Sequence, residues 1–211
     1  MSVPTINIEE NKKLFLDLVG SIERDGIKEL VAFLEKSDFF TAPASTRFHC
    51  SLPGGLALHS LNVYHMFEHK CKSEPFKSIL GDMPEDSRKI ITLLHDVCKT
   101  YMYEIDYRNK KIYSDTGSKR DEKGRFDWAA VEYYTINDRV PYGHGEKSVM
   151  MISEFIKLTP EEKYAIRWHM GFTEPKELYN TISTVYERYP LALALHEADL
   201  EASYILESRK K

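Results

Sequence analysis

Apolar residues recur at intervals of three and four positions along most of the chain, which is the period of an amphipathic helix. This pattern predicts two helices within residues 8–36, broken near Gly26, and a loop over residues 37–53. A further helix begins at Thr159, with Pro160 at its first position and a glutamate placed to close a capping box. Other helices are expected over residues 56–70, 85–98, 146–156, 159–170 and 190–207.

The pattern changes between residues 100 and 126. Tyrosine and isoleucine flank Arg108, Asn109 and Lys110, which predicts a short β-hairpin excursion around residues 100–115. A polar loop up to Arg125 and then a short helix over residues 127–134 are expected to follow. The expected fold is therefore mainly α, a helical bundle with one small β-hairpin.

Length and composition favour one ordinary globular domain. The chain has 211 residues, of which 42% are hydrophobic and 29% charged, and this excludes disordered and fibrous classes. We expect a single domain over residues 1–211, with N-terminal helices in 1–40 and the functional core at about 49–205. The first residues form no signal peptide and no apolar run is long enough for a membrane span, so we expect a cytoplasmic protein with no membrane partner. Its three cysteines follow no pairing or zinc-binding spacing and are expected to be reduced packing residues.

Charge is unevenly distributed. The net charge of −4 argues against a broad surface for long nucleic acids. Residues 107–125 nevertheless hold seven basic and three acidic side chains, a local charge of +4. Two interpretations are open, a solvated loop or a rim that attracts phosphate.

Histidine is the residue type that stands out, with eight copies. His59 lies one turn into its predicted helix, His95 and Asp96 lie in a strongly apolar segment, and Asp199 interrupts another. A carboxylate buried without a partner is costly, so two such aspartates need a common explanation. A divalent metal held by two imidazoles and two carboxylates supplies one, and iron, manganese, nickel and zinc all suit these ligands.

The segments around these residues resemble a known family. The segments PGGLALHS around His59, LLHDVCK around His95 and Asp96, and HEADL around Asp199 occur in one order. In that order they resemble the HD-domain superfamily of metal-dependent phosphohydrolases, and the resemblance extends over about residues 49–205. It implies a helical fold in which these four side chains bind a first metal ion.

Two further histidines extend the resemblance. Members with two metals are similar in placing two histidines between the doublet and the closing aspartate, where this chain has His144 and His169. The resemblance implies two divalent transition-metal ions, with Asp96 bridging them and His144 and His169 holding the second. Taken alone, the residues also allow ordinary polar roles for these two histidines.

The predicted catalytic residues are Asp96 and Lys99. Lys99 follows Asp96 by three positions and His95 by four, so the three share one helix face. Beside a metal, its ammonium would neutralise a phosphate oxygen and stabilise transition-state charge. The alternative is a lysine placed at a helix end by the dipole. The weaker candidates for contacts with substrate or with the metal ligands are His49, His196 and Arg167, whereas His65 and His69 are expected to be background.

The resemblance implies hydrolysis of a phosphomonoester or phosphodiester, by attack of a metal-bound hydroxide, on a nucleotide or another small phosphorylated substrate. Three alternatives stay open. The ligand set is similar to that of diiron HD-type oxygenases. The glycine pair before His59 resembles the HD portion of bacterial 3′–5′ exoribonucleases, which suggests exonuclease-like activity on short RNA or DNA. The third alternative is a non-catalytic nucleotide-binding regulatory module.

Overall fold

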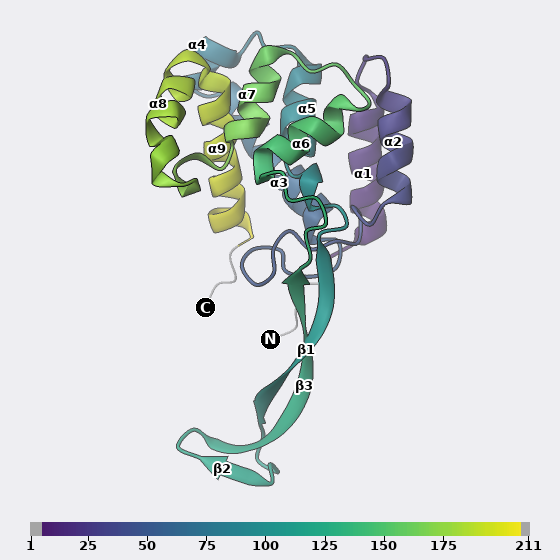
Figure 1. The fold of residues 1–211 in the computed structure, drawn as a ribbon, viewed down its shortest axis with the longest axis vertical. Helices are drawn as coiled ribbons and strands as arrows, with labels where there is room; N and C mark the ends of the chain where they lie inside the picture. The colour runs from purple at the N-terminus through teal and green to yellow at the C-terminus, as the bar shows by residue number, and fades with distance from the viewer. Residues whose placement is uncertain (1–5, 208–211) are drawn as a thin grey trace.

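The computed structural model describes residues 6–207, so the ends of the expected domain, residues 1–5 and 208–211, lie outside the described part. Most of the chain forms a helical body (Figure 1). Its α-helices are α1 (Ile8–Gly20), α2 (Ile27–Lys36), α3 (Gly55–Cys71), α4 (Phe76–Leu80), α5 (Glu85–Leu94), α6 (His144–Ser153), α7 (Pro160–Trp168), α8 (Tyr179–Arg188) and α9 (Pro190–Glu201). Shorter segments are the 3-10 turns η1 (Val97–Lys99), η2 (Gly171–Thr173) and η3 (Lys176–Leu178) and the π-helical η4 (Ala202–Leu206).

Helix α3 is central to the body, because α1, α5 and α9 all pack against it. Its start is fixed by glycine. Gly54 adopts a φ of +79°, and a Cβ on Gly55 would lie 1.9 Å from the carbonyl oxygen of Cys50. Helix α3 therefore begins at Gly55, because only glycines fit this backbone turn. His59 follows one turn later and faces the core, with 1% of its surface exposed.

The helices predicted from periodicity are confirmed in most places. Helices α1 and α2 occupy residues 8–36, and α7 begins with the predicted capping box, in which Thr159 Oγ1 accepts from the backbone N–H of Glu162 at 3.2 Å. Helix α5 ends at Leu94 rather than near residue 98, which leaves His95 and Asp96 at its C-terminal end. Helices α4 and α8 were not predicted, since α4 has only five residues and α8 carries mostly polar side chains.

The prediction for the β segment is wrong in its extent. Strand β1 (Tyr103–Tyr113) runs straight through the expected turn at Arg108–Lys110 and pairs antiparallel with β3 (Gly124–Ile136). With the short β2 (Lys119–Asp121), they form a three-stranded sheet in the order β1-β3-β2. The helix expected over residues 127–134 is also wrong, because its aromatic and β-branched side chains favour the extended pairing that β1 offers.

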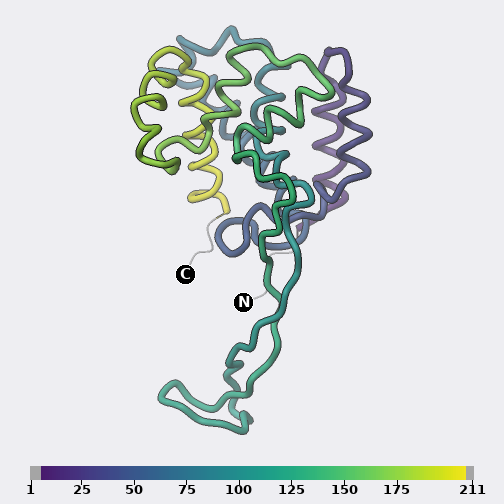
Figure 2. The backbone as a smooth tube through the Cα atoms, viewed as in Figure 1, coloured from purple at the N-terminus to yellow at the C-terminus, as the bar shows by residue number. Residues whose placement is uncertain are grey.

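Strands β1 and β3 form a long ribbon that extends away from the helical body, with β2 at its far end (Figures 1 and 2). The basic residues of segment 107–125 lie on the outer part of this ribbon. The interpretation of this segment as a phosphate-attracting rim beside the histidine and aspartate residues is therefore wrong.

Among the described residues, no helix has the length and apolar character that a bilayer crossing requires, and all three cysteines are free and buried.

Candidate metal centre

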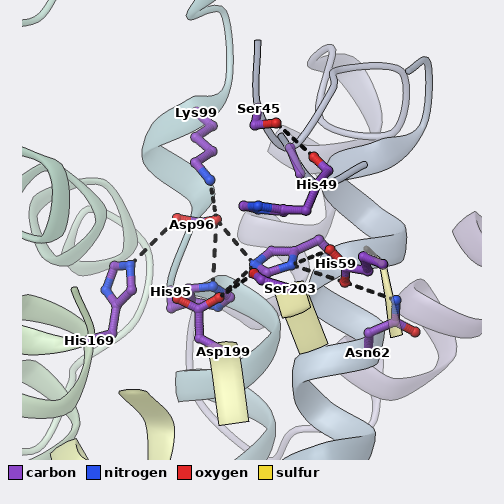
Figure 3. A network of polar contacts seen from close by, with 12 residues as sticks. Ser45, His49, His59, Asn62, His95, Asp96, Lys99, His169, Asp199 and Ser203 are labelled. Atoms are coloured by element: carbon purple, nitrogen blue, oxygen red, sulfur yellow. Dashed lines mark hydrogen bonds and ion pairs between the residues drawn. The ribbon is translucent and has the colours of Figure 1, made fainter. Parts of the chain in front are cut away.

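All six side chains predicted as metal ligands come together inside the helical body. They come from different helices or helix ends: His59 on α3, His95 and Asp96 after α5, His144 at the start of α6, His169 after α7 and Asp199 on α9. Figure 3 shows five of them directed toward one another around Asp96. The contacts between α3, α5, α7 and α9 bring these positions together, although up to 140 positions separate them along the chain.

The carboxylate of Asp96 is the centre of the cluster, and its two oxygens face different partners. Oδ1 lies 2.8 Å from Nε2 of His144 and 3.6 Å from Nε2 of His169. Oδ2 lies 3.5 Å from Nε2 of His95 and 3.6 Å from Nε2 of His59. One carboxylate therefore separates the four histidines into two pairs.

Two of these histidines have ring nitrogens without a hydrogen-bond partner. His95 and His169 are both fully buried, and their Nδ1 atoms donate to the backbone carbonyls of Thr92 at 2.8 Å and Ile166 at 2.7 Å. Each Nε2 is thereby left as the acceptor nitrogen, and neither has a partner within hydrogen-bonding distance. A bare nitrogen lone pair that faces a carboxylate oxygen needs a positive charge between them, either a proton or a metal ion.

His59 is held from both sides by carboxylates. Its Nε2 lies 3.2 Å from Oδ1 of Asp199, while its Nδ1 lies 3.1 Å from both oxygens of Glu207. Burial disfavours the charged imidazole, but the hydrogen bonds to Asp199 and Glu207 outweigh it and raise the pKa of His59 to about 10. Without a metal, this position therefore holds a proton. His95 differs, because burial lowers its pKa to about 3 and keeps it neutral.

Lys99 contacts the same carboxylate. Its Nζ donates to Oδ2 of Asp96 at 2.6 Å. Burial disfavours the charged form of both groups, but the charge of each stabilises the charge of the other. The pKa of Asp96 is therefore held well below its ordinary value, and the pKa of Lys99 is raised. Both groups are therefore ionised at neutral pH, and the ammonium keeps two further N–H donors.

The weaker candidates have distinct surroundings. The imidazole of His49 lies next to that of His59, with ring centroids 4.8 Å apart and the ring planes tilted by 40°, and burial lowers the pKa of His49 to about 4. His196 Nδ1 donates to the backbone carbonyl of His169 at 2.6 Å, so it supports the turn that carries a predicted ligand. Arg167 points elsewhere and pairs with two carboxylates, Glu146 at 2.5 Å and Glu174 at 2.7 Å. His65 and His69 are exposed on α3, as expected of background residues.

The cluster includes residues that the sequence did not indicate. Glu207 is buried against His59 and also accepts from Asn62 at 2.9 Å. Cys98 Sγ lies 3.3 Å from Nδ1 of His144, so this thiol contacts a predicted ligand. Cys98 lies within the segment LLHDVCK but was expected only to pack, and Glu207 belongs to no motif, since the close approach of α9 and η4 to α3 brings it to His59.

The donor set fits a divalent transition metal. Three of the possible ligand groups overlap in their members: His59, His95 and Asp199; His95, Asp96 and His169; and Asp96, Cys98 and His144. Imidazole nitrogens and carboxylate oxygens are ligands that such metals accept. The unpartnered Nε2 atoms of His95 and His169 are the nitrogens left for a metal, because each Nδ1 donates to a backbone carbonyl. No family model, curated protein or solved structure matches the chain.

Proposed function

We propose that the chain is a metal-dependent phosphohydrolase of the HD-domain type, acting on a phosphomonoester or phosphodiester of a nucleotide or another small phosphorylated molecule. The observation that carries this proposal is the division of Asp96, whose Oδ1 faces His144 and His169 and whose Oδ2 faces His59 and His95. A carboxylate with two occupied sides is what a bridge between two cations requires. The motif order around His59, His95-Asp96 and Asp199 supports the family.

In this proposal, two divalent cations would be held around Asp96. His59, His95 and Asp199 would hold the first, and His144 and His169 would hold the second. Divalent cations there supply Lewis acidity toward a phosphoryl oxygen and lower the pKa of water that contacts them.

The role of Lys99 follows from its charge and its free donors. Its ammonium is held beside Asp96 at 2.6 Å, which leaves two N–H groups for the oxygens of a phosphoryl group. The partial burial of its side chain, which is 13% exposed, strengthens these contacts relative to those in bulk water. Lys99 thereby stabilises the negative charge that develops on the phosphoryl oxygens during the reaction.

In this proposal, His49 contacts the substrate beside Lys99. Its Nε2 is buried without a hydrogen-bond partner, and its ring lies next to that of His59. Because its pKa is lowered to about 4 by burial, the imidazole is neutral at physiological pH. A neutral imidazole binds a phosphate ester by donating one hydrogen bond.

The test combines metal analysis with hydrolysis assays. The purified chain is loaded separately with manganese, iron, nickel and zinc, its metal content is measured, and a chromogenic phosphomonoester and phosphodiester are offered. Asp96→Ala is expected to lose both bound metal and hydrolysis. Lys99→Met is expected to keep the metal and to lose about 10²–10³-fold in kcat, the usual cost of removing one such donor.

His65→Ala is the matched control, because His65 is exposed on the same helix as His59. It is expected to keep both metal and rate. Failure of all four metals to bind would overturn the proposal, and so would hydrolysis that survives in Asp96→Ala. Dioxygen uptake by the iron-loaded chain without phosphoester cleavage would replace it with oxygenase chemistry.

A further inference from the structure

The ribbon formed by β1 and β3 has two chemically different faces. In an antiparallel ladder, paired residues share a face, and successive pairs alternate between the two faces. One face carries the pairs Tyr103–Ile136, Ile105–Tyr134, Tyr107–Glu132, Asn109–Ala130, Lys111–Trp128 and Tyr113–Phe126. We refer to these pairs as the aromatic face. The opposite face carries mostly polar and charged residues, including Glu104, Asp106, Arg108 and Lys110.

Much of the aromatic face is open to solvent. Ile105 is 57% exposed, Tyr107 61%, Trp128 50% and Ile136 58%. The main contacts of β1 and β3 are with each other, and the ribbon extends beyond the helical body (Figure 2). An isolated two-stranded ribbon is at best marginally stable in water, and an uncovered apolar face of this kind marks an interaction surface.

The charges on the ribbon argue against a nucleic acid as the occupant. Sites for single strands combine aromatic rings and basic side chains on one surface. Here Arg108 and Lys110 lie on the opposite face. The charged residues on the aromatic face balance, because Lys111 and Glu132 are joined there by Lys119 and Asp121 of β2, which lie beside Phe126. Lys111 pairs with Asp121 at 2.5 Å, and Glu132 accepts from the hydroxyl of Tyr107 at 3.1 Å.

We propose that the aromatic face binds the same face of a second copy of this chain, so that two ribbons stack about a two-fold axis. An isologous contact requires a surface that is complementary to itself. The pair Asn109–Ala130 has the smallest side chains of this face, and an axis through it permits the closest approach. That axis sets Lys111 of one copy against the Tyr107–Glu132 pair of the other, and no like charges meet.

Overall charge and area agree with this arrangement. Residues 107–125 of the ribbon total +4, whereas the residues outside the ribbon, 1–102 and 137–211, total −4. In an antiparallel stack, the basic end of each ribbon approaches the acidic body of the other copy. Large aromatic side chains bury about 150–250 Å² each, so the half-exposed residues offer roughly 500 Å² per ribbon. Two ribbons then bury about 1,000 Å², the size at which a specific interface is expected.

Two isoleucines on β1 provide a matched test in the full-length chain. Ile105 lies on the aromatic face, whereas Ile112, which is 44% exposed, lies on the opposite face. Sedimentation velocity over a range of concentrations is expected to show a dimer for the unaltered chain. Ile105→Glu is expected to raise the dissociation constant at least tenfold, and Ile112→Glu to leave it within twofold.

Cross-linking tests the position of the axis. Asn109→Cys is expected to give a disulfide-linked dimer on mild oxidation, because this residue approaches its own copy at the axis. Lys110→Cys, on the opposite face, is expected to stay unlinked. The paired exchange Lys111→Glu with Glu132→Lys is expected to dimerise, while either single change weakens the dimer.

Several outcomes would overturn the proposal. One is an unaltered chain that sediments as a monomer at every concentration tested. Equal effects of Ile105→Glu and Ile112→Glu are another. Binding of a single-stranded oligonucleotide that Ile105→Glu abolishes would assign the aromatic face to nucleic acid instead.

Discussion

Glu207→Gln tests whether the carboxylate behind His59 contributes to metal binding. Both oxygens of Glu207 lie 3.1 Å from Nδ1 of His59, and the side chain is 1% exposed. Glutamine has nearly the same shape and keeps one acceptor oxygen for His59, but it removes the negative charge. The substitution therefore changes the electrostatics of this contact and leaves its packing almost intact.

The expected size follows from the type of hydrogen bond that is lost. A hydrogen bond to a charged group contributes about 1.5–3 kcal/mol and a neutral one about 0.5–1.5 kcal/mol. The exchange therefore removes about 1–2 kcal/mol, which corresponds to a roughly 5–30-fold weaker metal affinity. Carboxylates that orient a metal-binding histidine have effects of about 10–100-fold when altered, so the two estimates overlap.

Metal affinity is measured by competition with a chromogenic chelator. Histidine NMR of the metal-free chain gives a second reading, in which the pKa of His59, about 10 in the unaltered chain, is expected to fall. Glu201→Gln is the matched control, because Glu201 contacts Lys70 at 2.7 Å rather than a histidine. Unchanged affinity and an unchanged His59 pKa in Glu207→Gln would refute the reasoning.

The remaining predictions concern stability and helix packing. A chelator is expected to lower the melting temperature and added metal to restore it, since a ligand bound only by the folded chain stabilises it; an unchanged calorimetric transition would contradict metal binding. Gly145→Ala is expected to cost about 1–3 kcal/mol and to weaken metal binding, because its Cβ would lie 2.2 Å from the carbonyl oxygen of Arg167 and force α6 away from α7; native stability and affinity would refute this. Glu162→Gln removes a buried partner of Arg24 at 2.6 Å and is expected to cost about 3 kcal/mol in urea unfolding, whereas Lys13→Gln in an exposed pair is expected to cost less than about 1 kcal/mol. Burial opposes the ionisation of Glu162, but its hydrogen-bond partners lower its pKa below 4.5. The stabilisation by the ionised Glu162 is therefore present above pH 4.5 and is lost as the pH falls through the lowered pKa. Urea midpoints with the same pH dependence in Glu162→Gln and in the unaltered chain would contradict it.

The apolar period and the capping residues predicted the helices, because each of these signals depends only on residues within one helix. The period that places Ile27, Leu30 and Leu34 on one face is a property of α2 alone, and all three are buried. The capping box at Thr159 and Glu162 is also local. The convergence of His59 and Asp199 was predictable only through the family resemblance, because their spacing along the chain gives no measure of distance in space.

The ribbon and the contact of Glu207 with His59 were not predictable in the same way. Strand β1 continues through Arg108–Lys110 because β3 provides a partner for every residue of it, and that pairing is non-local. Glu207 reaches His59 because the π-helical turn of η4 ends with its backbone N–H bonded to the carbonyl of Ala202 at 3.0 Å. No residue near Glu207 indicates this turn, since a π-turn depends on the packing of the helix end.

The order in which the six predicted ligands lie along the chain has a consequence during synthesis on the ribosome. His59, His95 and Asp96 leave the ribosome early, while the carboxylates of Asp199 and Glu207 that hold His59 come from the last described helical turns. A growing chain therefore presents a partial set of histidines that lacks its closing carboxylates. The complete set forms only when α9 and η4 pack against α3, so a metal ion that this set can hold would bind late, after release of the C-terminal helix, and a chain that stops before Asp199 has no complete set.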